Sequence, residues 1–148
     1  MSIAALVLTC GVTTVGPPTS AHASAADCEG GANGFLDIPD TKSGQVVRGP
    51  LNMGYGVEVT LERDTVGWGG REYGFAKIKG NTGPYDNIWM DWTRDGGRTW
   101  LQCGPFQVGG YNLSKTSAAK YTSSDANYQF RACGSVAYNH VVICTTWW

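Results

Sequence analysis

Short runs of alternating apolar and polar residues recur along the chain, and nearly all have the period of a β-strand. Residues 57–63 read VEVTLER and residues 87–93 read NIWMDWT, so apolar side chains fall on every second position. Because successive side chains of a strand point to opposite faces, each run predicts one apolar and one polar face. Further strands are expected at residues 34–38, 45–48, 73–79, 99–103, 106–108, 128–132, 135–137 and 141–145. No segment has a convincing helical period, and residues 115–121 (KTSAAKY) are expected to make at most one helical turn.

The segments between these runs are rich in Gly, Pro and Asn, the residues that favour tight turns. About eight to ten short strands joined by such turns are typical of sandwiches and small barrels. The sequence therefore predicts an all-β fold: a single-domain antiparallel β-sandwich or small barrel.

The first 25 residues differ from the rest and predict a signal peptide. Residues 3–15 are apolar or small and carry no charge. Ala21-His22-Ala23 and Ala23-Ser24-Ala25 both satisfy the small-x-small rule for signal-peptide cleavage. We therefore expect residues 1–25 to be removed and residues 26–148 to form one secreted, extracellular domain, with the exact N-terminus between Ser24 and Asp27.

Two features of this leader depart from the usual pattern. No Lys or Arg precedes Lys42, so the basic start of a signal peptide is missing. Cys10 raises the alternative of a lipid-anchored protein, but Thr9 stands where lipoprotein signals have Gly, Ala or Ser. The apolar run is also too short for the roughly 20 residues of a membrane span.

Composition excludes several classes of partner. The chain has 12 acidic and 11 basic residues, a net charge of −1, and only 16% charged residues. Nothing in this balance indicates attraction to nucleic acid or to an anionic membrane. No phosphate-binding loop or cofactor fingerprint occurs, so no cofactor is expected.

Four cysteines follow the leader: Cys28, Cys103, Cys133 and Cys144. An even number in a small exported domain predicts two disulfides, with three possible pairings. A tight turn at residues 138–139 would place Cys133 opposite Cys144 on antiparallel strands, within disulfide range. Cys28–Cys103 then follows by elimination. A zinc site is disfavoured because no two cysteines are close in sequence and only one histidine follows the leader.

Residues 93–100 (TRDGGRTW) match the Asp-box pattern Ser/Thr-x-Asp-x-Gly-x-Thr-Trp. Its defined positions are Thr93, Asp95, Gly97, Thr99 and Trp100. Asp95 is expected to accept hydrogen bonds from turn amides, Gly97 to supply a positive φ, and Trp100 to cover the base of a hairpin. The motif resembles the Asp-box hairpins of sialidases and other secreted, often carbohydrate-active, β-proteins. That resemblance implies a structural role, remote from any active site.

The general character of the chain also resembles small secreted β-domain proteins of Streptomyces-type actinobacteria. The resemblance rests on size, export, four cysteines and the Cys-Thr-Thr-Trp-Trp ending. It implies an extracellular habitat and a disulfide-bonded β-domain, and it does not imply a defined activity.

Evidence for catalysis is sparse, and no catalytic residue is assigned. His140 is the only histidine after the leader, no Gly-x-Ser-x-Gly motif occurs, and no free thiol remains once the cysteines pair. Asp86, Asp91 and Asp125 could supply a glycosidase pair, but we expect Asp86 and Asp91 at turns or on an exposed strand face. A small secreted hydrolase is therefore the last of three functional alternatives.

Aromatic residues give the best candidate for a binding surface. The six tryptophans and seven tyrosines all follow the leader, more than a core of this size needs. Trp68 and Tyr85 lie in Gly-rich turns, and Trp89 is expected on the strand face opposite Trp92. Arg71 is added because Arg joins Trp and Tyr among the residues that dominate interfaces. The hypothesis is that Trp68, Arg71 and Tyr85, with Trp89 as a weaker candidate, bind a partner or ligand.

The expected function is that of a secreted, non-catalytic protein-binding module: an inhibitor, or an adaptor subunit of an extracellular toxin or lectin complex. A glycan-binding or cell-wall-binding module is the first alternative. Exposed aromatic side chains suit either a protein or a sugar, because one part of the ring is apolar and another can hydrogen-bond.

Overall fold

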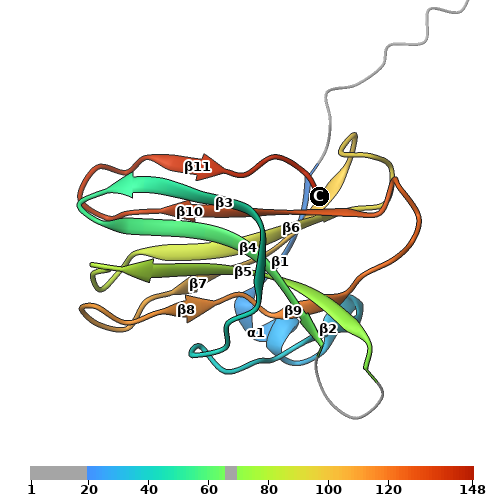
Figure 1. Cartoon of the computed structure of the whole chain (residues 1–148), viewed down its shortest axis with the longest axis horizontal. Coiled ribbons are helices and arrows are strands. Elements are labelled where there is room, and N and C mark those ends of the chain that lie inside the picture. Colours follow the sequence, from blue (N-terminus) through green and yellow to red (C-terminus); the bar gives the residue numbers. More distant parts are fainter. Residues whose placement is uncertain (1–19, 66–69) are drawn as a thin grey trace, which may run out of the picture.

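The computed structural model describes residues 20–65 and 70–148, which form two stacked β-sheets (Figure 1). The five-stranded sheet has the order β1 (Ser20–Ala23), β7 (Trp100–Gln107), β6 (Asn87–Thr93), β10 (Gln129–Ser135) and β11 (Val142–Cys144). The six-stranded sheet runs β2 (Phe35–Leu36), β9 (Ala119–Tyr121), β5 (Glu72–Gly80), β4 (Val57–Thr65) and β3 (Gln45–Gly54), and β8 (Lys115–Thr116) also pairs with β5. The only helical elements in these ranges are α1 (Ala25–Glu29) and a short 3₁₀ turn, η1 (Ala32–Gly34). The predicted all-β sandwich is confirmed.

The core lies between the two sheets and is built from the alternating positions of the sequence. Val59 and Leu61 of β4 are fully buried, as are Ile88 and Met90 of β6. Phe130 of β10 completes the same cluster from the neighbouring strand. The apolar faces expected for residues 57–63 and 87–93 therefore both point into the core.

A second layer covers the outer face of β5. Tyr73 and Phe75, on that outer face, are buried against Ile38 and Ala119. Lys77, on the same face, is 4% exposed and donates to the carbonyl of Lys42 and, at 2.8 Å, to Ser43 Oγ. The alternation of residues 73–79 thus does not separate core from solvent, because both faces of β5 are covered.

Residues 115–121 form β8 and β9 and do not make a helical turn. Ser117 lies between these strands, and its backbone N–H donates to the carbonyl of Ala76 at 2.9 Å. The Ser117 hydroxyl accepts from the Ala76 N–H, also at 2.9 Å. Pairing with β5 therefore decides the conformation of this segment, and the weak helical propensity of KTSAAKY does not.

The folded domain begins before residue 26. Strand β1 pairs in parallel with β7, with Ala21 opposite Leu101 and Ala23 opposite Cys103. Ser24 then caps α1 through a capping box with Asp27. The segment expected to be removed thus includes residues that the structure places in the sandwich.

Two disulfides join elements of the fold, one across 75 residues and one across 11. Cys28 of α1 is bonded to Cys103 of β7, and Cys133 of β10 to Cys144 of β11. The second pair occupies directly opposed positions of an antiparallel ladder, as the expected turn requires. No helix in the described part of the chain is long and apolar enough to cross a membrane.

Candidate functional site

Four turns meet at one end of the sandwich, on the left in Figure 1, and each presents one exposed tyrosine. The turns are β3–β4, β5–β6, β7–β8 and β10–β11, and their tyrosines are Tyr55, Tyr85, Tyr111 and Tyr138. These side chains are 77%, 67%, 76% and 51% exposed, respectively. Together they line one depression of about 330 Å³. We call this surface the four-tyrosine end.

Unusual backbone conformations concentrate in the same turns. Tyr55, Tyr85, Asn112 and His140 all have positive φ, between 51° and 76°, which non-glycine residues rarely adopt. Outside these turns, the described residues include one other such residue, Asn33. A left-handed backbone conformation costs a non-glycine residue conformational free energy. Such residues tend to cluster at binding surfaces.

A buried carboxylate holds two of the turns together. Asp86 is 4% exposed. Its Oδ2 accepts from the Gly83 N–H at 2.8 Å within the β5–β6 turn. Its Oδ1 accepts from the Ala137 N–H at 2.9 Å in the β10–β11 turn. Asp86 therefore lies at a turn, as expected, and both of its carboxylate oxygens accept hydrogen bonds from backbone amides of the turns.

Two of the tyrosines are fixed in place by their neighbours. The Tyr138 hydroxyl donates to the carbonyl of Met53 at 3.0 Å. The rings of Tyr55 and Tyr138 meet edge to face, with centroids 4.4 Å apart. Desolvation, with Tyr55 and Asp86 nearby, raises the pKa of Tyr138, so its phenol is protonated at neutral pH. The surface is thus largely organised before any partner arrives.

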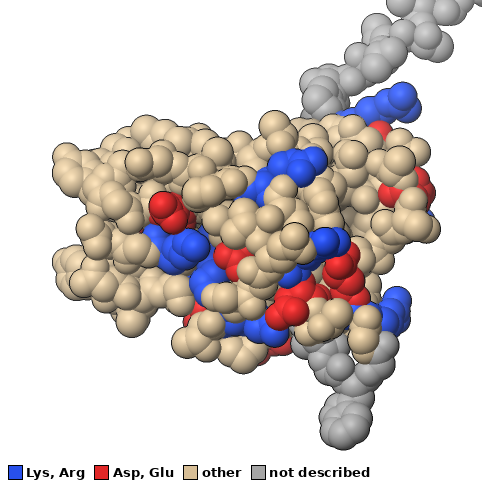
Figure 2. All heavy atoms as spheres, viewed as in Figure 1, with Lys and Arg blue, Asp and Glu red and all other residues tan. Residues whose placement is uncertain are grey.

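The four-tyrosine end carries almost no charge. Residues 54–56, 81–86, 108–114 and 136–141 contain no Lys, Arg or Glu, and their one carboxylate is the buried Asp86. Figure 2 shows the visible face of this end free of charged side chains, while acidic and basic residues gather toward the other end. A partner here would meet aromatic rings, hydroxyls and amides.

The structure brings only one of the predicted binding residues to this end, Tyr85. Trp68 lies outside the described residues. Arg71 is exposed but lies at the opposite end of β5, where its guanidinium carbon is 3.7 Å from the ring centre of Tyr121. Trp89 is half-buried on the outer face of the five-stranded sheet, opposite Cys133. Arg71, Tyr85 and Trp89 therefore do not form one surface.

Sequence reasoning missed the other three tyrosines, although a common signal marks them. Tyr55 lies between two glycines, Tyr111 is flanked by Gly110 and Asn112, and Tyr138 precedes an asparagine. Each therefore sits in a turn between two strands, as Tyr85 does. The signal is a repeated association of Tyr with turn-forming residues.

Away from the four-tyrosine end, an arginine packs between two tryptophans and pairs with a buried aspartate. The guanidinium carbon of Arg131 lies 4.8 Å from the ring centre of Trp100 and 4.6 Å from that of Trp147, and we call these three residues the Trp–Arg cluster. Arg131 Nε and Nη2 also contact Asp91 Oδ2, at 2.8 and 2.7 Å. Asp91 is only 2% exposed, so the expectation of an exposed strand face or turn was wrong for this residue. Burial raises the pKa of Asp91, and Arg131 opposes that shift.

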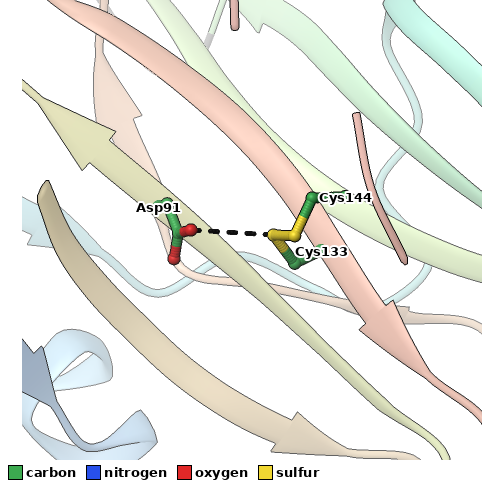
Figure 3. Close-up of side chains that lie close together, drawn as sticks. All are labelled: Asp91, Cys133 and Cys144. Atoms are coloured by element: carbon green, nitrogen blue, oxygen red, sulfur yellow. Dashed lines mark hydrogen bonds between the residues drawn. A yellow bond between two sulfur atoms is a disulfide. The ribbon is translucent and has the colours of Figure 1, made fainter. Parts of the chain in front are cut away.

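Asp91 also approaches the second disulfide (Figure 3). Its Oδ2 lies 3.6 Å from Cys133 Sγ. Asp91, Cys133 and Cys144 place one oxygen and two sulfur atoms within 4.8 Å of one another, close enough to suggest a metal site. Metal binding requires thiolates, whereas both sulfurs are here joined to each other. In the oxidised protein this group therefore serves packing.

His140 lies at the tip of the β10–β11 turn and is exposed. It borders a second depression, of about 370 Å³, together with Asn87, Gln107 and Ser135. No carboxylate is among the described residues that line this depression. Among the described residues that line this depression, His140 therefore has no carboxylate beside it for acid–base chemistry.

The 93–100 hairpin lies at the end of β6 away from the four tyrosines. Asp95 accepts from the Thr99 N–H at 2.9 Å and from the Thr99 hydroxyl at 2.6 Å. These bonds, with one from Thr93, lower the pKa of Asp95 to about 2. Gly97 has a φ of 88°, and a Cβ there would come within 2.7 Å of Trp147. The hairpin is therefore stabilised by hydrogen bonds among its own residues and by packing against Trp147 near the C-terminus.

Comparison with known proteins adds no family. No family model, curated protein or solved structure matches this chain. The functional argument therefore rests on the chain's own surface.

Proposed function

We propose that this protein is a secreted, non-catalytic binding module that contacts an extracellular protein partner through its four-tyrosine end. The observation that carries the proposal is the convergence of four turns, from both sheets, that each present an exposed tyrosine at one depression. Roles as an inhibitor or as an adaptor subunit of a secreted complex both use such a surface.

The composition of these turns supports a protein partner. They consist largely of Tyr, Gly and Asn, the residues that antibodies favour in their binding loops. Tyrosine supplies a large amphipathic contact area with few rotatable bonds, and it is among the residues that dominate interfaces. With no exposed carboxylate or amine in these turns, a partner need not desolvate a charge.

Preorganisation supports the same proposal. Asp86 ties two of the turns together, and the Tyr138 hydroxyl is anchored on Met53. Because these groups are already ordered, less conformational entropy is lost on association. A rigid disulfide-bonded frame presenting fixed tyrosines suits an inhibitor or adaptor.

The test compares two variants of the secreted protein, immobilised and exposed to the medium in which its source grows. Tyr55→Asn/Tyr85→Asn removes two rings and keeps a residue type that tolerates positive φ. Arg98→Ala, on the 93–100 hairpin, is the matched control because Arg98 is exposed at the other end. We expect a protein captured by the wild type and by Arg98→Ala, and bound at least tenfold more weakly by the double variant. Equal capture by all three forms would sink the proposal.

Glycan binding is a second candidate, favoured by the concavity of the site. A depression of about 330 Å³ lined by tyrosines, with Asn81 and Thr82 at its wall, offers apolar ring faces and neutral hydrogen-bonding groups to a sugar. The same variants, titrated against soluble neutral polysaccharides and cell-wall fragments, separate the two candidates. Saturable glycan binding that is lost only in Tyr55→Asn/Tyr85→Asn would favour the sugar.

A further inference from the structure

Strand β1 occupies the edge of the five-stranded sheet in an unusual way. It is parallel to β7, whereas every other strand pair in the described part of the chain is antiparallel. Only Ala23 of its four residues is buried, at 7% exposed, while Ser20, Ala21 and His22 remain exposed. The strand thus covers backbone groups of β7 and contributes one small side chain to the core.

The chain also carries a cleavage signal at the end of this strand. Ala21-His22-Ala23 and Ala23-Ser24-Ala25 both fit the rule for signal-peptide cleavage. Cleavage after Ala25 would remove Ser24, whose hydroxyl accepts from the Asp27 N–H at 3.1 Å and caps α1. Cleavage after Ala23 keeps this cap and places the new amino group 3.2 Å from Asp27 Oδ2. Of the two sites, only cleavage between Ala23 and Ser24 keeps the cap of α1 in the mature chain.

That cleavage uncovers the edge of β7. The backbone groups of residues 100–103 that pair with β1 lose their partners, and an unpaired edge is a template for another strand. Beside it lies a depression of about 420 Å³, lined on one side by Ser20 and Ala21 and on the other by residues that include Trp92, Arg94 and Leu101. Loss of β1 would join edge and depression into one groove.

Apolar side chains line this groove. Trp92 borders the depression, and so does Leu101, which is opposite Ala21 in the ladder. The groove thus combines an apolar floor with a backbone edge.

We propose that, after cleavage between Ala23 and Ser24, the β7 edge binds an extended segment of a partner protein in parallel orientation, in the place that β1 occupies. The segment carries a small side chain at the position of Ala23, which is buried, and a larger uncharged side chain at the position of Ala21, which borders the depression. Main-chain hydrogen bonds supply affinity, and these alternate positions supply selectivity.

A second copy of this chain fits the groove less well. Two identical strand edges related by a two-fold axis pair antiparallel, because the same patch must meet itself. The structure instead shows this edge accommodating a parallel strand. The inference rests on the secretion part of the proposed function and not on the four-tyrosine end.

The test uses two secreted forms, residues 24–148 and residues 20–148, the second retaining β1 as a built-in cover. The probe is a synthetic peptide of residues 14–23 (TVGPPTSAHA), titrated while backbone amide signals are followed by NMR. We expect the amides of residues 101–103 to shift in the 24–148 form and to be unchanged in the 20–148 form. An Ala21→Leu peptide should bind more tightly, and an Ala23→Lys peptide at least tenfold more weakly.

Several outcomes would overturn the inference. One is a mature protein, sequenced from the medium, that retains Ser20–Ala23. Another is a 24–148 form whose residues 101–103 do not respond to the peptide, or which dimerises through β7. Tyr55→Asn/Tyr85→Asn in the 24–148 form should bind the peptide as the wild type does, so failure of the edge and failure of the four-tyrosine end are distinguishable.

Discussion

The four-tyrosine end and the Trp–Arg cluster use aromatic side chains in opposite ways. In the Trp–Arg cluster, two half-buried indoles enclose a guanidinium that is itself paired with the buried Asp91. At the four-tyrosine end, each ring is more than half exposed and the nearest carboxylate is turned inward to backbone amides. The aromatic rings of the Trp–Arg cluster are packed within the fold, whereas those of the four-tyrosine end are exposed to solvent.

This difference shows why counting aromatic residues does not locate a binding surface. All five described tryptophans are only partly exposed, so the excess over a minimal core is largely taken up by packing on the outer faces and at the chain's end. The four turn tyrosines stay more than half exposed because no helix or strand of the described chain covers them. Exposure relative to available cover, and not abundance, identifies the candidate site.

The largest effect should come from breaking the Trp–Arg cluster. Arg131→Ala leaves Asp91 buried without its cation and removes the group that both indoles contact. We expect a loss of about 3 kcal/mol in the free energy of unfolding, measured by denaturant titration, because an unpaired buried charge is costly. The control Arg98→Ala should lie within about 0.5 kcal/mol of wild type. A loss no larger than the control's would mean that this cluster is not structural.

Removing the second disulfide should come next. Cys133→Ala/Cys144→Ala opens a loop between residues 11 apart in sequence, in a hairpin that other ladder bonds also hold. The expected loss is about 2–3 kcal/mol, because the unfolded chain regains the entropy of that loop. The domain should still fold, with its far-ultraviolet circular dichroism retained. Complete unfolding of the double variant would contradict this expectation.

The sequence predicted the strands that bury one face, but not the features that depend on tertiary cover. Alternation identified β4 and β6 because one of their faces meets the core. It could not anticipate that residues 115–121 would form strands that pair with β5, since local propensity does not report a pairing partner. Asp91 was misplaced for the same reason, because its ion-pair partner Arg131 is 40 residues away in sequence.

The candidate site was predictable only in part. Tyr85 was found because Gly and Pro precede it in a turn, and the same reasoning applies to Tyr55 and Tyr111. The sequence could not predict how the two sheets stack, and it is this stacking that brings the four turns to one end. Arg71 illustrates the converse, because the length of β5 separates it from Tyr85.

The pH dependence of the 93–100 hairpin should be a smaller effect. Hydrogen bonds from Thr99 and Thr93 hold the pKa of Asp95 at about 2, below its usual 3.8. A depressed pKa means that the stabilisation is complete above about pH 4 and is lost as the pH falls through about 2. Melting temperatures measured from pH 2 to pH 6 should therefore fall more steeply below pH 4 in the wild type than in Asp95→Asn. Identical slopes would show that this carboxylate does not stabilise the hairpin.

The smallest effect on stability should come from the four-tyrosine end itself. Tyr85→Asn and Tyr111→Ala each remove a ring that is at least two-thirds exposed, so the free energy of unfolding should change by no more than about 0.5 kcal/mol. Tyr121→Ala is the matched control, because the Tyr121 ring packs 4.0 Å from that of Tyr73 and also carries Arg71. That control should cost about 1–2 kcal/mol, measured by the same denaturant titration. If Tyr85→Asn or Tyr111→Ala destabilised the protein as much as Tyr121→Ala, the exposed tyrosines would be part of the fold, and the contrast with the Trp–Arg cluster would fail.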